Sequence, residues 1–173
     1  MGTDTNTKKR TSNDVHTPLR YPGGKSFLTG FLSQVYEANG IEIGIYAEPF
    51  AGGAGAAISL LLAEKVNHIY LNDANWAVAA FWKALLEQSE RFVSLVEETP
   101  VTLEEWWKQK TVFDQKNSRS NDPRDILELG FAMFFLNRCN RSGILNAGPI
   151  GGRTKAQQDT ATYKIDARFN KPA

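Results

Sequence analysis

A glycine-rich turn between an apolar run and a helix of small residues constrains the fold of this chain most strongly. It follows a short buried strand predicted at 43–47 and opens a helix predicted at 54–65, and it reads Glu48-Pro49-Phe50-Ala51-Gly52-Gly53-Ala54-Gly55. Glycines let the backbone turn sharply and let a ligand approach the main chain, while the helix start offers free N–H groups. A strand, a glycine turn and a helix form the first βαβ unit of a nucleotide-binding fold.

Asp73 supplies a second element of such a site. It follows the next predicted strand, at 68–71, and lies 21 residues after Gly52. An acidic side chain at this place can accept hydrogen bonds from both hydroxyls of a ribose. The full dinucleotide spacing G-x-G-x-x-G is not met, because Ile58 stands at its third glycine position when counting starts at Gly53. The alternative is a tight turn followed by a helix-capping aspartate, with no ligand.

The rest of the chain is mostly helical in its pattern. Apolar spacing predicts helices at 25–37, 75–86, 92–97, 103–113 and 126–138. Before the last of these, Asp122-Pro123 places a capping residue ahead of a proline in the first turn. Residues 140–162 are rich in Gly, Asn, Thr and Gln and are predicted to be loops. The pattern therefore indicates an α/β fold class.

Charge and composition exclude some classes of protein. The chain has 20 basic and 19 acidic residues, so any contact with nucleic acid must come from a local cluster of charge. Its single cysteine, Cys139, excludes an internal disulfide and suits a reducing compartment. No uncharged stretch reaches the roughly 20 residues of a membrane span. We expect a cytoplasmic protein without a membrane partner.

Several segments resemble the DNA adenine methyltransferase family in order and spacing. They are Pro18-Leu19-Arg20-Tyr21-Pro22-Gly23-Gly24-Lys25, Ala47 to Gly55, Leu71-Asn72-Asp73 and Leu136-Asn137-Arg138. The resemblance implies transfer of a methyl group from S-adenosylmethionine to the exocyclic amine of adenine in duplex DNA. It also implies the N-terminal portion of a Rossmann-like methyltransferase fold, with its first βαβ unit, a helical insertion and the start of a DNA-recognition region.

The resemblance also assigns roles to residues of the cofactor site. Tyr21 and Lys25 would line the methionine end of S-adenosylmethionine, and Asp73 would hold the ribose. The floor beneath the cofactor would be formed by Glu48, Phe50, Gly52 and Gly55. Most aromatic side chains sit at helical spacing and are predicted to be core. Trp76 is the exception, because a ring three residues after Asp73 could lean against the adenine of the cofactor.

A basic segment after the last predicted helix is the candidate DNA-binding region. Four positive charges fall within 18 residues, at Arg138, Arg141, Arg153 and Lys155. Interspersed amides and glycines allow close approach to phosphates and base edges. The resemblance makes Arg141, Ser142, Ile144 and Asn146 the residues most expected to touch DNA, with Arg138 and Arg153 beside them. The alternative is that Arg138 and Arg141 only cap the end of a helix.

The acceptor loop of the family, Asp-Pro-Pro-Tyr, is not found among the 173 residues. The nearest match, Asp122-Pro123-Arg124-Asp125, differs at its third and fourth positions and precedes the Leu-Asn-Arg segment. We therefore expect a chain truncated before the catalytic loop, with no catalytic residue and no activity alone. Its expected organisation is a disordered tail (1–17), a cofactor-binding half-domain (18–90), a helical segment (91–139) and a loop-rich start of the recognition region (140–173).

The strand order points to a missing neighbour. In a doubly wound sheet ordered 3-2-1-4-5, strand 1 lies between strands 2 and 4, but only strands 1 and 2 are predicted here. A bare edge invites association, so we expect either a chain that supplies the catalytic half or self-association. Three interpretations remain open: an adenine methyltransferase that needs complementation, a non-catalytic cofactor- or DNA-binding protein, and a decayed fragment.

Overall fold

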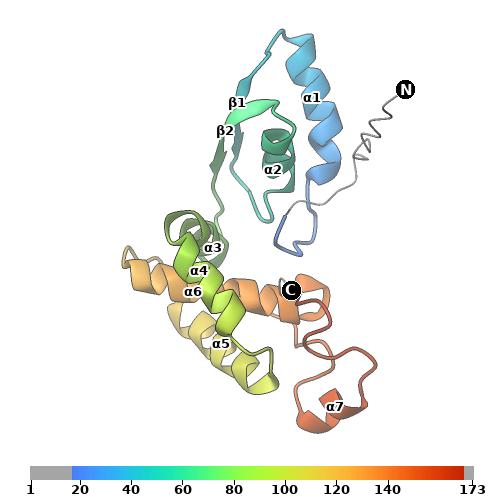
Figure 1. Cartoon of the computed structure of the whole chain (residues 1–173), viewed down its shortest axis with the longest axis vertical. Helices are drawn as coiled ribbons and strands as arrows, with labels where there is room; N and C mark the ends of the chain where they lie inside the picture. Colours follow the sequence, from blue (N-terminus) through green and yellow to red (C-terminus); the bar gives the residue numbers. More distant parts are fainter. Residues whose placement is uncertain (1–16, 170–173) are drawn as a thin grey trace, which may run out of the picture.

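The computed structural model describes residues 17–169, so almost all of the expected polar tail lies outside the described residues. A small parallel sheet forms the centre of the N-terminal part (Figure 1). Strand β1 (Gly44–Glu48) pairs with β2 (Val66–Leu71), and Glu48 lies opposite Leu71 at their carboxyl ends. Both predicted strands are therefore confirmed, with β1 shifted by one residue and β2 starting two residues earlier.

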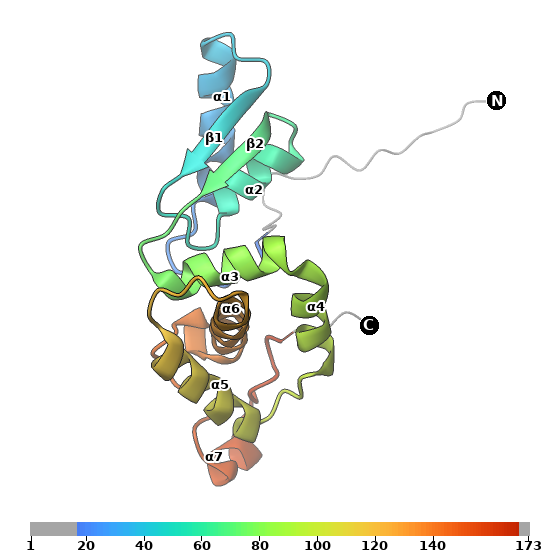
Figure 2. The same cartoon turned by 90° about the vertical axis from the view of Figure 1, so that its left-hand side faces the viewer.

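Two helices lie on the same side of this sheet. Helix α2 (Gly55–Leu62) packs on the strands, and α1 (Thr29–Ala38), preceded by a 3-10 turn at Ser26–Leu28, packs on α2 (Figure 2). Helix α2 begins one residue later than predicted, because Ala54 adopts a left-handed conformation with φ of 50°. A helix cannot continue through that conformation in an L-residue.

The opposite face of the sheet is bare in the described part of the chain. Ile45 and Tyr70 point away from the helices and are 61% and 59% exposed. The apolar side of the α1 region is also open, since Phe27 and Phe31 are 78% and 62% exposed. The helix predicted at 25–37 is therefore present, but the described residues leave Phe27 and Phe31 of its apolar face uncovered.

The remaining helices form a separate layer below the sheet (Figure 1). They are α3 (Trp76–Glu87), α4 (Ser89–Glu98), α5 (Leu103–Lys116), α6 (Pro123–Cys139) and the short α7 (Lys155–Thr160). The predicted cap is confirmed, because the side chain of Asp122 accepts a hydrogen bond from the Arg124 N–H. Helix α7 lies in the region predicted to be loops, and a capping box of Thr154 and Gln157 stabilises its start. No helix in the described ranges is long and apolar enough to cross a membrane.

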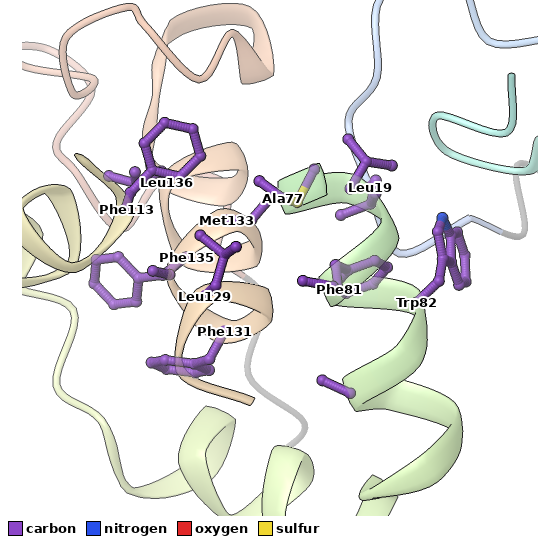
Figure 3. Close-up of a cluster of buried hydrophobic side chains, with 14 of the residues drawn as sticks. Leu19, Ala77, Phe81, Trp82, Phe113, Leu129, Phe131, Met133, Phe135 and Leu136 are labelled. Atoms are coloured by element: carbon purple, nitrogen blue, oxygen red, sulfur yellow. The ribbon is translucent and has the colours of Figure 1, made fainter. Parts of the chain in front are cut away.

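The core lies between α3 and α6 (Figure 3). Phe81 of α3 stacks on Phe134 of α6 with ring centres 5.9 Å apart, and Phe81 and Phe92 form a T-shaped pair with ring centres 5.6 Å apart. Leu19 reaches this core from the segment that precedes the sheet and is only 3% exposed. Most of the aromatic residues predicted to be core are buried, but Trp107 is 47% exposed. This core is continuous with the glycine turn and α2, since the same buried cluster includes Ala51, Ala54 and Ala57.

Gly130 allows α3 and α6 to approach closely. A Cβ at this position would lie 2.7 Å from the Ala80 carbonyl oxygen and 3.0 Å from the Ala84 Cβ. We expect Gly130→Ala to lower the free energy of unfolding by about 1–3 kcal/mol, because the two backbones must move apart. Urea denaturation measures this change. Gly30→Ala in α1 is the matched control, since nothing lies within 4 Å of its Cβ. Equal effects of the two substitutions would contradict the close packing.

Candidate functional site

The carboxyl ends of β1 and β2 are joined through Asp73. Its Oδ2 accepts a hydrogen bond from the Gly52 N–H at 2.8 Å, and its Oδ1 accepts one from the Asn75 N–H at 2.9 Å. The carbonyl oxygen of Gly52 in turn accepts a buried hydrogen bond from Trp82 Nε1 at 2.9 Å. The aspartate therefore fastens the glycine turn to the start of α3. A carboxylate has about four acceptor positions, so capacity for further hydrogen bonds remains.

Lys25 and Glu48 form a second connection across the turn. Glu48 is 2% exposed, and its Oε2 accepts a hydrogen bond from the Ala57 N–H in the first turn of α2. Lys25 Nζ lies 2.9 Å from Glu48 Oε1 and donates a hydrogen bond to the Phe50 carbonyl oxygen at 2.7 Å. The approach to Oε1 falls outside hydrogen-bond geometry, so this buried oxygen is paired by charge but receives no hydrogen bond from any described residue.

Tyr21 lies against the glycine turn. A Cβ at Gly52, where φ is +49°, would be 2.8 Å from the Tyr21 ring, and a Cβ at Gly55 would be 3.3 Å from Ser26. Burial raises the pKa of the Tyr21 hydroxyl, and the negative charge of Asp73 raises it further. The absence of a side chain at Gly52 and Gly55 thus leaves room for the Tyr21 ring and for Ser26. The fold brings the whole predicted cofactor set to one end of the sheet, with Phe50 74% exposed there.

A hollow of about 660 Å³ borders Asp73. It lies along β2 between α2 and α3, and its largely apolar lining includes Ile58, Ile69, Leu71, Trp76 and Trp82. Trp76, which the sequence indicated as a possible neighbour of adenine, is half-buried in this lining. Asp73 is the member of the predicted cofactor set that lines the hollow, so the hollow extends from the site along β2.

The candidate DNA-binding region begins with a closed loop after α6. Asn140 is fully buried, and its Nδ2 donates hydrogen bonds to the carbonyl oxygens of Ile144 at 2.9 Å and Leu145 at 3.0 Å. Its Oδ1 accepts a hydrogen bond from Trp106 Nε1 at 2.7 Å. An antiparallel bridge between Asn140 and Pro149 closes the loop at its base. Residues 140–149 are called the recognition loop below.

The predicted DNA-binding residues fall into two groups. The exposed ones, on or next to the recognition loop, are Arg141, Ser142, Ile144, Asn146 and Arg153. Arg138 is different, because its Nη1 donates a hydrogen bond to the Pro18 carbonyl oxygen at 3.4 Å. Burial lowers the pKa of Arg138, and the nearby charge of Arg20 lowers it further. Arg138 therefore contacts the N-terminal segment, whereas the others face solvent.

Sequence reasoning missed the side chains that hold this region together. Asn137 and Asn140 are fully buried, and Arg20 joins the two parts of the molecule. The available signal was a pair of amides, Asn137 and Asn140, at the C-terminal end of the largely buried helix α6, since buried polar groups are nearly always hydrogen-bonded. Within residues 17–169, no group of three or more potential metal-ligating side chains is present.

Comparison with models of known protein families gives a match over most of the chain. A family model described as D12 class N6 adenine-specific DNA methyltransferase matches residues 21–171. The matched region contains the glycine turn, Asp73, the helical layer and the recognition loop. No curated protein matches the chain.

Proposed function

This chain belongs to the D12 class N6 adenine-specific DNA methyltransferase family, and from that premise we propose that it binds S-adenosylmethionine and duplex DNA. The family supports a role in DNA adenine methylation. The cofactor is placed at the carboxyl ends of β1 and β2, and the DNA at the recognition loop. The observation that most supports this proposal is the Asp73 carboxylate, which is held by the Gly52 and Asn75 N–H groups beside an apolar hollow.

The residues present are compatible with S-adenosylmethionine. Asp73 keeps acceptor capacity for a ribose diol, and the hollow beside it has a volume typical of small-molecule sites. Trp76 adds an aromatic ring to the lining. The buried Glu48 Oε1, which receives no hydrogen bond, could be satisfied by an amino group of the ligand. When bound, the cofactor supplies a methyl group activated on a sulfonium, while these residues bind and orient it.

The recognition loop supports a contact with DNA through its exposed residues. Arg141 and Arg153 lie near each other, since a Cβ at Gly148 would be 3.6 Å from one guanidinium and 3.0 Å from the other. Two cations in this arrangement can bind backbone phosphates. Ser142 and Asn146 are exposed beside them and can donate to or accept from base edges. The hydrogen bonds of Asn140 tie the start of the loop to the Ile144 and Leu145 carbonyl oxygens.

We propose that the target amine is held by residues that belong neither to the cofactor site nor to the recognition loop. The Asp-Pro-Pro-Tyr loop is not found in the sequence, and positioning of the amine is a large part of the catalysis that a protein supplies. The free edges of the two-stranded sheet are where further strands would pair. We propose that strands pairing at these edges carry the residues that hold the amine, in a cytoplasmic setting. Without them, the chain would act as a non-catalytic cofactor- or DNA-binding protein.

Methyl transfer by the purified chain provides a direct test. We expect no incorporation of tritiated methyl groups from S-adenosylmethionine into duplex DNA above the blank, because the acceptor loop is missing. Filter-bound radioactivity after incubation with adenine-containing duplexes is the measurement. Incorporation that disappears in Asp73→Ala would show that the chain is active on its own and would contradict this expectation.

A further inference from the structure

Arg20 lies between the candidate cofactor site and the recognition loop. Its neighbour Tyr21 contacts the glycine turn at Gly52. The backbone of Arg20 is bonded in both directions to the side-chain amide of Asn137: its N–H donates to Oδ1 at 2.8 Å, and its carbonyl oxygen accepts from Nδ2 at 3.1 Å. One side chain of α6 therefore fixes the residue next to the candidate cofactor contact.

The same amide also reaches the recognition loop. Asn137 is fully buried, and its Nδ2 donates a second hydrogen bond to the Gly143 carbonyl oxygen at 2.8 Å. Both N–H groups and the oxygen of the amide are thus used on backbone atoms of two segments that are far apart in the sequence. Because unpaired backbone groups are costly when buried, this geometry is strongly favoured over alternatives.

Direct packing strengthens the connection. A Cβ at Gly143, where φ is +71°, would lie 2.0 Å from the Arg20 carbonyl oxygen. Arg20 Nη1 also donates hydrogen bonds to the carbonyl oxygens of Arg138 at 3.3 Å and Asn140 at 3.2 Å. Residues 18–21 and the recognition loop are therefore in contact along several points, and restriction of one segment restricts the other.

We propose that Asn137 is a positioning residue that couples the cofactor site to the recognition loop. This inference rests on the proposed function, since it takes Tyr21 as a cofactor contact and the loop as the DNA contact. A ligand that orders Tyr21 orders Arg20, and the Asn137 amide passes this restriction to Gly143. Because the cofactor has then already ordered the recognition loop, DNA binding has a smaller entropy cost. The two ligands therefore bind cooperatively.

Hydrogen exchange of the full chain, read by mass spectrometry with and without S-adenosylhomocysteine, tests the coupling. In the unmodified chain, the ligand is expected to slow exchange roughly fivefold or more both in residues 18–21 and in the recognition loop. In Asn137→Asp, which removes both N–H donors, the protection should stay confined to 18–21. Gly143→Ala should have the same effect, because its methyl group would lie 2.0 Å from the Arg20 carbonyl oxygen and push the loop away from Arg20 while the Asn137 side chain is kept.

Gly40→Ala is the matched control for the second variant. Gly40 also has a positive φ, of +66°, but its Cβ would meet nothing within 4 Å, so the substitution adds strain without breaking the junction. In Gly40→Ala, the ligand should slow exchange both in residues 18–21 and in the recognition loop, as in the unmodified chain. Protection limited to 18–21 in the unmodified chain, or full transmission in both junction variants, would overturn the coupling and leave the cofactor proposal intact. A ligand that changes exchange nowhere would remove the cofactor site and the coupling with it.

Discussion

Replacing Asp73 by alanine is expected to weaken the binding of S-adenosylhomocysteine roughly 10- to 150-fold, which corresponds to about 1.5–3 kcal/mol for a hydrogen bond to a charged group. The carboxylate is the acceptor proposed for the ribose, and it also holds the Gly52 and Asn75 N–H groups. Its loss removes a ligand contact and loosens the turn at the same time. Isothermal titration calorimetry measures the dissociation constant directly.

Two further variants separate these effects. Asp73→Asn keeps a single carbonyl acceptor and the size of the side chain, so it should preserve more of the turn while weakening ligand binding. Asp159→Ala changes an exposed carboxylate on α7, far along the chain from the site, and should leave the dissociation constant unchanged. Thermal melting of each variant reports whether the fold survives. A dissociation constant that does not change in Asp73→Ala would remove this residue from the binding site.

The 173-residue chain is expected to self-associate, because one face of its sheet is uncovered. Parallel strands are found almost only where both faces of the sheet are covered, yet Ile45 and Tyr70 are exposed on one face. Within the described residues, β1 pairs with β2 alone, so its other edge has no strand partner. Light scattering at several concentrations should therefore give a mass well above 19.2 kDa that rises with concentration.

A charge placed on the bare face should reverse this behaviour. Ile45→Lys puts an ammonium group at the centre of the exposed apolar surface, so we expect the measured mass to fall toward that of the monomer. Val93→Lys is the control, since Val93 is 46% exposed on α4, away from the sheet. If the unmodified chain is a concentration-independent monomer with a cooperative melt, the exposed sheet is stable in water and the expectation is wrong.

The local pattern of residues determined both strands and most of the helices, and it predicted which residues meet at the carboxyl ends of the strands. The turn from Glu48 to Gly55 must follow a strand and precede a helix, and Asp73 must follow the next strand. Since neighbouring parallel strands end at the same edge of a sheet, these residues must lie close together. The cap at Asp122 was equally readable, because it involves an N–H only two residues away.

Only the tertiary structure decided which surfaces are covered and which polar groups act as connectors. Periodicity shows that Phe27 and Phe31 share a face, but it carries no information on whether another element packs there. Arg138 and Arg141 look alike in the sequence, yet one lies against Pro18 and the other faces solvent. The bond between the Asn137 amide and Arg20 spans 117 residues, so it exists only because the helical layer brings the N-terminal segment to the end of α6.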